Sequence, residues 1–294
     1  IFCTILCFDI KNDIFNKNRE IKEEPQSVLL QFPDTYGYAT PAASAILSVL
    51  VSKGYIFLLI KIFYRVLGQE NVIASQIVNV LFVFGLAGMV MGSLHAILER
   101  DMRRMIAFSS VAQIGYIYMG IGLGTQAGMI AAIFHIFTHS ATKALLFISA
   151  VGLYEVSGDR KDYKSLRGSG YRNPLAGIGF GIGALSMVGF PMLSGFISKL
   201  LFATSALQSP SKMLPTLIVL AVSTVLNAVY FLRMVITIYS IPREKEKSMK
   251  EGESLPGSWN LRLAITCFIL LNLTLGLFSQ PIVKAIGNGL AMFA

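Results

Sequence analysis

Apolar residues in this chain form long runs that are separated by short polar stretches. Several runs reach the roughly 20 residues that a helix needs to cross a membrane. Each such run must be a helix, because lipid offers the backbone no hydrogen-bond partners. The approximate ranges of the seven predicted spans are 41–64, 72–98, 103–123, 126–155, 174–206, 214–240 and 259–279. The pattern predicts an all-α, polytopic transmembrane helix bundle.

The two ends of the chain differ from this pattern. Residues 1–35 hold a charged block that cannot cross lipid, and the short apolar stretch before it lacks the charged leader of a signal peptide. We expect 1–35 to be an atypical polar segment, a fragment or an artefact. The transmembrane domain is predicted over 36–280, and the tail 281–294 is expected to form a short interfacial helix.

Composition supports a membrane protein and argues against other classes. Only 14% of residues are charged and mean hydropathy is +0.64, whereas soluble domains carry about 25% charged residues. A net charge of +9 could suit nucleic acid, but the basic residues sit in loops beside apolar helices, so no nucleic-acid partner is expected. Cys3, Cys7 and Cys267 predict neither a disulfide framework nor a thiolate metal site.

Basic residues mark alternate loops. The loops 99–104, 156–172 and 241–258 follow the second, fourth and sixth spans and are rich in Lys and Arg. The intervening loops carry little positive charge. By the positive-inside rule the three basic loops are predicted to be cytoplasmic, in a multi-pass protein of the cell membrane.

The span 174–206 contains residues that interrupt helices. Gly189, Pro191 and Gly195 lie close together in its middle. Proline lacks a backbone donor and clashes with the preceding turn, so a discontinuous helix is predicted here. Transporters use such breaks to direct backbone dipoles at ions. A simple proline kink in a packed helix is the alternative.

Three ionisable residues share one face of the fourth span. His135, His139 and Lys143 are spaced by four, which suits a water-bridged proton chain with a rise of about 6 Å per step. Histidine titrates near neutral pH and burial can bring lysine there. Zinc would need a further ligand, and the interiors of the spans contain no Asp or Glu. A bis-histidine haem normally takes its ligands from two helices. Neither a metal nor another cofactor is therefore expected.

Two further lysines lie within apolar spans. Lys53 sits midway along the first span, too deep to reach the membrane surface easily, and is predicted to be a protonatable relay site. Lys199 follows the predicted break and is expected off-centre, toward one exit. Its alternative is an anchoring lysine whose amine reaches the interface. Buried cations without intramembrane carboxylates favour a proton path over an oxygen-lined sodium site.

Four segments resemble, in the same order, motifs of the antiporter-like subunits of NADH-quinone oxidoreductase, Mrp cation/proton antiporters and membrane-bound hydrogenases. Residues 32–45 are similar to WLPDAY…TPVSAL, and 101–116 to DLKRLLAYSSVSQLGY. Residues 135–147 are similar to HLxTHAxFKALLF, and 189–199 to GIPPLSGFxSK. The resemblance covers about 170 residues.

The resemblance implies a role for each buried cation. Lys53 matches the lysine between the two half-channels of the family. His135, His139 and Lys143 match its central relay, and Lys199 matches the lysine or glutamate of the second broken helix. Protons are thought to move along hydrated chains between these groups. The implied partners are neighbouring membrane subunits, the lipid bilayer, protons and, in an antiporter, Na+.

The resemblance covers the family's second repeat. The first inverted repeat, with its own glutamate and lysine, has no counterpart, so the chain is expected to hold the central relay and one half-channel. Redox cofactors would belong to partner subunits. A respiratory subunit and an Mrp antiporter subunit fit these motifs equally, and a structural membrane module that no longer conducts protons is the alternative function.

Overall fold

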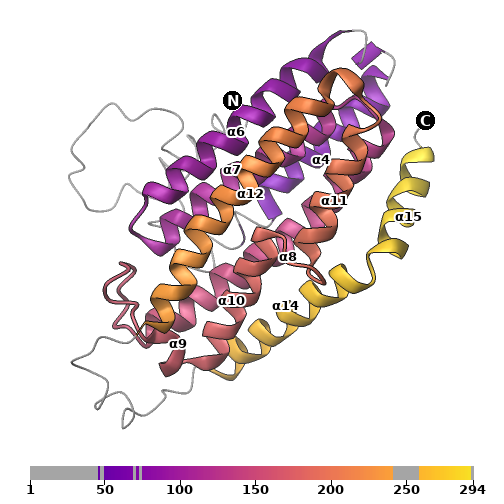
Figure 1. The fold of residues 1–294 in the computed structure, drawn as a ribbon. Helices are drawn as coiled ribbons and strands as arrows, with labels where there is room; N and C mark the ends of the chain where they lie inside the picture. Colours follow the sequence, from indigo (N-terminus) through magenta and orange to yellow (C-terminus); the bar gives the residue numbers. More distant parts are fainter. Residues whose placement is uncertain (1–45, 47–49, 69–70, 73–74, 241–257, 293–294) are drawn as a thin grey trace, which may run out of the picture.

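A computed structural model of the chain describes residues 46, 50–68, 71–72, 75–240 and 258–292. The polar segment 1–35, the motif at 32–45 and most of the basic loop 241–258 lie outside these residues. Every named regular element in the described part is a helix (Figure 1). The predicted all-α bundle is confirmed.

The helices follow the predicted spans. The first span is described as α4 (Ser52–Ile62) and a π-helical segment, η2 (Phe63–Leu67). Among the residues that the structure describes, five helices are long and apolar enough to cross a membrane. These are α6 (Ile77–Leu98), α7 (Met102–Gly122), α8 (Gln126–Glu155), α12 (Pro210–Tyr239) and α14 (Trp259–Leu277). The shorter helices are α9 (Ser169–Arg172), α10 (Pro174–Val188), α11 (Ser194–Ala206) and α15 (Ser279–Ala291).

Helix α8 is the centre of the bundle. It packs against α7, α10, α11, α14 and α15 (Figure 1). Helices α7 and α8 are buried along most of their length, whereas α6, α12 and α14 expose apolar side chains such as Val83, Val225 and Leu270. An apolar exterior of this extent is unfavourable in water and suits lipid or neighbouring membrane subunits.

The C-terminal helix α15 packs against the N-terminal half of α8. Leu290 is buried in an apolar cluster with Met129 and Ile133 of α8 and Ile117 of α7. The sequence predicted a helix here, and a helix is present. Its interfacial position stays a prediction.

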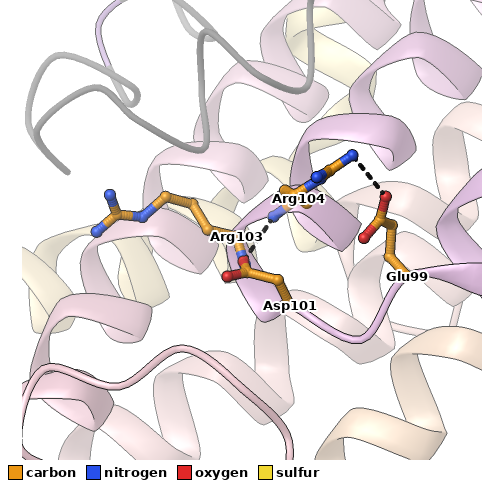
Figure 2. A network of polar contacts seen from close by, with 4 residues as sticks. All are labelled: Glu99, Asp101, Arg103 and Arg104. Carbon is orange, nitrogen blue, oxygen red and sulfur yellow. Dashed lines mark hydrogen bonds and ion pairs between the residues drawn. The ribbon is translucent and has the colours of Figure 1, made fainter. Parts of the chain in front are cut away.

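A polar corner joins α6 to α7 (Figure 2). The Asp101 carboxylate accepts hydrogen bonds from the backbone N–H groups of Arg103 at 2.8 Å and Arg104 at 3.0 Å. Asp101 is therefore the N-cap of α7. The Arg104 guanidinium forms an ion pair of 3.2 Å with Glu99, as Figure 2 shows.

The basic loop after α8 lies against this corner. The backbone N–H of Met102 donates to the Lys161 carbonyl, and that of Tyr163 donates to the Arg100 carbonyl. Arg233 of α12 donates to the Tyr163 hydroxyl at 3.1 Å, and burial raises the pKa of that phenol, which keeps it a neutral partner. The loops 99–104 and 156–172 therefore share one end of the bundle, as the charge pattern predicted.

Candidate functional site: buried lysines, histidines and a broken helix

The helix predicted over 174–206 is broken between Val188 and Ser194. Gly189 has φ +95°, a left-handed conformation that favours glycine, and its N–H donates to the Leu185 and Ser186 carbonyls to close α10. A Cβ on Gly195 would lie 1.8 Å from the Ser186 carbonyl oxygen. Glycine at 195 therefore permits the first turn of α11 to approach the last turn of α10.

Lys199 lies at this break. Its ammonium donates a hydrogen bond of 2.7 Å to the carbonyl oxygen of Val188, and its aliphatic chain runs beside Gly189. The side chain is partly buried. The C-terminal end of a helix carries a partial negative charge that attracts cations. The break therefore provides Lys199 with a cation site formed by the backbone.

The row His135, His139 and Lys143 faces the interior from α8, with exposed fractions of 4%, 2% and 0%. The two imidazole rings are parallel within 2°, with centroids 5.8 Å apart. The Lys143 ammonium donates to the Ile106 carbonyl at 2.7 Å and also to the Ser109 hydroxyl, both on α7. The predicted shared face is therefore present and is turned toward α7 and α11.

His135 connects this row to α11. Its Nδ1 lies 2.6 Å from the Ser198 hydroxyl oxygen. The ring also stacks on Tyr116 at 5.5 Å, and the Lys199 ammonium lies 6.0 Å from the centroid of the same tyrosine ring. His135 and Lys199 thus both contact one aromatic side chain of α7.

Several imidazole nitrogens of the row are buried without a hydrogen-bond partner among the described residues. They are Nε2 of His135 and both ring nitrogens of His139. A buried polar atom is costly unless it is hydrogen-bonded, and buried water commonly fills that role. The chemistry of the row therefore suits hydration and proton exchange.

Lys53 reaches the same row from α4. It is 3% exposed and lies within electrostatic range of His135, His139 and Lys143. The structure therefore brings together all five residues that the sequence predicted as a relay. They come from α4, α8 and α11.

Ser109, Tyr116, Ser186 and Asn272 were not predicted from the sequence as partners of the site. Ser109 and Tyr116 lie within the motif at 101–116. The match of that motif was the sequence feature that could have identified them. Asn272 is a polar residue in an otherwise apolar stretch, which marks a buried hydrogen-bonded group. Ser186 gave no distinguishing signal, since serine commonly packs between membrane helices.

In the described part of the chain, no three His, Cys, Asp or Glu side chains are placed so that they could hold a metal ion together. His135 and His139 project from one helix with parallel rings, whereas axial haem ligands approach from opposite faces of the porphyrin.

Comparisons with known proteins place the chain in a family. A family model described as NADH:quinone oxidoreductase/Mrp antiporter, TM matches residues 28–227, more than half of the chain. The chain belongs to this family.

Members of the NADH:quinone oxidoreductase/Mrp antiporter family include similar sequences of greater length. NADH-quinone oxidoreductase subunit N of Desulforudis audaxviator is 31% identical over 260 residues, which cover 86% of this chain and 51% of that protein. Subunit N of Halorhodospira halophila is 26% identical, with coverages of 85% and 51%. The chain spans about half the length of these relatives.

Two solved structures share the fold. A chain of the Mrp complex from Dietzia sp. superposes with a TM-score of 0.75 at 25% identity, covering 87% of this chain and 54% of that one. A chain of the membrane-bound sulfane sulfur reductase, an archaeal respiratory membrane complex, gives the same TM-score and identity, with coverages of 87% and 50%. This chain thus shares its fold with about half of each of these two chains.

Proposed function

We propose that this chain conducts protons through a hydrated Lys/His relay. It would do so as a subunit of a respiratory NADH-quinone oxidoreductase-like complex or of an Mrp-type Na+/H+ antiporter. The observation that carries the proposal is the environment of Lys143. This side chain is fully buried at the centre of the bundle, and its ammonium donates hydrogen bonds to two neutral oxygens, the Ile106 carbonyl and the Ser109 hydroxyl.

A permanent charge in such a place is expensive. Moving a cation to the centre of a membrane costs about 2.5–3.5 kcal/mol or more, and the described membrane helices offer no Asp or Glu short of Glu155 at the end of α8. A lysine there is stable if it is hydrated or releases its proton. A side chain that is hydrated and one that can release its proton are both suited to carrying protons.

The order of the groups suggests a route. A proton passes between Lys53 and Lys143 at the α4 side, along His139 and His135, and then to Lys199 at the helix break. Successive groups on α8 are separated by a rise of about 6 Å, so water must bridge each step. The Ser198 hydroxyl holds the His135 ring in place and can donate to or accept from its Nδ1 in either tautomer.

The setting of this route is also proposed. The chain sits in the cell membrane, in contact with lipid and with other membrane subunits. Its basic loops 99–104, 156–172 and 241–258 face the cytoplasm, and any redox cofactor belongs to a partner subunit. Residues 36–280 form the conducting domain, and Na+ is the second ion if the complex is an antiporter.

Proton flux driven by a pH step tests the proposal in proteoliposomes that contain the parent complex. Lys143→Ala and Lys199→Ala are compared with wild type and with Lys212→Ala, whose ammonium donates to the Gly122 carbonyl outside the row. We expect both relay variants to abolish flux while Lys212→Ala keeps it, with equal assembly in all cases. Wild-type flux in both relay variants would instead favour a structural module that does not conduct protons.

A further inference from the structure

Asn272 is a fully buried amide within an apolar stretch of α14. Burying an amide without hydrogen bonds costs about 2–7 kcal/mol, so its contacts are expected to be specific. Helix α14 lies beyond residues 28–227, which the family model matches. The four sequence motifs and the proposed proton route do not include this residue.

The Asn272 side chain contacts both halves of the broken helix and the relay helix. Its Oδ1 accepts hydrogen bonds from the Ser186 hydroxyl of α10 at 2.8 Å and from the Ser194 hydroxyl of α11 at 2.7 Å. Its Nδ2 donates to the Thr142 hydroxyl of α8 at 2.9 Å. Thr142 is adjacent in sequence to Lys143.

The direction of these hydrogen bonds is fixed by chemistry. An amide oxygen can only accept, so Ser186 and Ser194 must both donate to Asn272. The Ser186 oxygen then accepts from the Gly195 N–H at 3.3 Å. Thr142, which accepts from Asn272, donates its own proton to the Thr138 carbonyl at 2.8 Å.

The beginning of α11 depends on this arrangement. The residue at its N-cap, Leu193, makes no side-chain capping bond within the described structure. The first N–H groups of a helix need acceptors from elsewhere. The Ser186 hydroxyl, oriented by Asn272, supplies one of them from the end of α10. The two half-helices are therefore joined through an α14 side chain.

The backbone of α14 also packs closely against the helix break. A Cβ on Gly276, one turn beyond Asn272, would lie 2.3 Å from the Met192 carbonyl oxygen. Glycine at 276 thus allows α14 to lie directly against the residues that separate α10 from α11. This close contact does not depend on the hydrogen bonds of Asn272. It also places α14 against the break between α10 and α11.

We infer that Asn272 is a positioning residue that sets the geometry of the helix break relative to α8. By holding Ser186 and Ser194 together, it keeps the Val188 carbonyl where Lys199 binds it. The consequence for conduction rests on the proposed function, whereas the consequence for the break geometry does not. Helix α14 is thereby part of the relay machinery.

The test uses Asn272→Leu, which keeps the size of the side chain and removes its polar atoms. The matched control is Thr216→Val, because Thr216 is equally buried and its hydroxyl donates to the Lys212 carbonyl of its own helix, α12. A double variant, Ser186→Ala with Ser194→Ala, removes both donors without touching α14. If the Asn272→Leu variant fails to fold, the double variant still tests the inference.

Two readouts are compared in the intact complex. Spin labels on cysteines introduced at Ile178 and Leu200, which are exposed positions of α10 and α11, report the distance across the break. The native cysteines 3, 7 and 267 are replaced by serine. Proton flux after a pH step is measured in parallel.

We expect Asn272→Leu and the double variant to broaden the distance distribution and to lower flux about tenfold or more. Thr216→Val should change neither readout.

Each outcome is informative. An unchanged distance distribution in both the Asn272→Leu and double variants overturns the inference, even if flux falls. A broadened distribution with wild-type flux supports the positioning role of Asn272 but overturns its consequence for conduction, because the break geometry then does not govern flux. If flux is insensitive to Lys143→Ala and Lys199→Ala as well, the proposed function has failed, while the distance measurement still decides whether Asn272 positions the break.

Discussion

The Lys199 ammonium donates a hydrogen bond of 2.7 Å to the carbonyl oxygen of Val188, the last residue of α10. The two residues lie on opposite sides of the helix break. The bond stabilises the protonated amine and also satisfies a carbonyl that has no partner further along its own helix. Loss of the Lys199 proton would weaken this contact, so proton occupancy and the geometry of the break are coupled.

The break should not tolerate a side chain at position 195. Gly195→Ala places a methyl group 1.8 Å from the Ser186 carbonyl oxygen, which must displace α10 or α11. We expect a loss of stability of about 1–3 kcal/mol, measured by thermal unfolding of the purified complex. Gly181→Ala is the matched control on α10, since nothing lies within 4 Å of its added Cβ. Equal thermal stability of the two variants would contradict the described packing.

The contact between His135 and Ser198 should matter for conduction. Ser198→Ala removes the hydroxyl 2.6 Å from Nδ1 and frees the ring to rotate. We expect proton flux to fall by about tenfold with normal assembly. Ser205→Ala on the same helix is the control, because that hydroxyl bonds the Leu201 carbonyl of its own helix. Flux unaffected by Ser198→Ala would remove this serine from the route.

The N-cap of α7 should contribute stability without affecting conduction. Asp101→Ala removes the acceptor for two backbone N–H groups and should cost about 1 kcal/mol. Asp101→Asn retains a capping oxygen and should cost less. Thermal unfolding gives the order of stability, and flux should stay at the wild-type level in both variants. A loss of flux in Asp101→Asn would mean that the carboxylate has a further role.

Local chemistry made most of the fold predictable. The length of each apolar run predicted the spans, and Gly189, Pro191 and Gly195 predicted the break. The four-residue spacing in α8 predicted that His135, His139 and Lys143 share a face. These features depend on residues close together in sequence, which is why a single chain was sufficient to infer them.

Contacts between distant segments were not predictable in this way. Lys199 was expected off-centre or anchored at the interface, but its position on the Val188 carbonyl depends on how α11 folds back toward α10. Asn272 bonds residues 78 to 130 positions away in the chain. The chain contains many serines and threonines that could have formed hydrogen bonds with Asn272. The packing of α14 places Ser186, Ser194 and Thr142 beside it.

The most direct test of the relay is the substitution Lys143→Arg. Arginine keeps the positive charge and the donors for Ile106 and Ser109 but does not release its proton in proteins. A structural role needs only the charge and the hydrogen bonds, whereas a relay needs deprotonation. We predict that Lys143→Arg assembles normally and lowers proton flux as far as Lys143→Ala does. Wild-type flux in an assembled Lys143→Arg complex would contradict the relay.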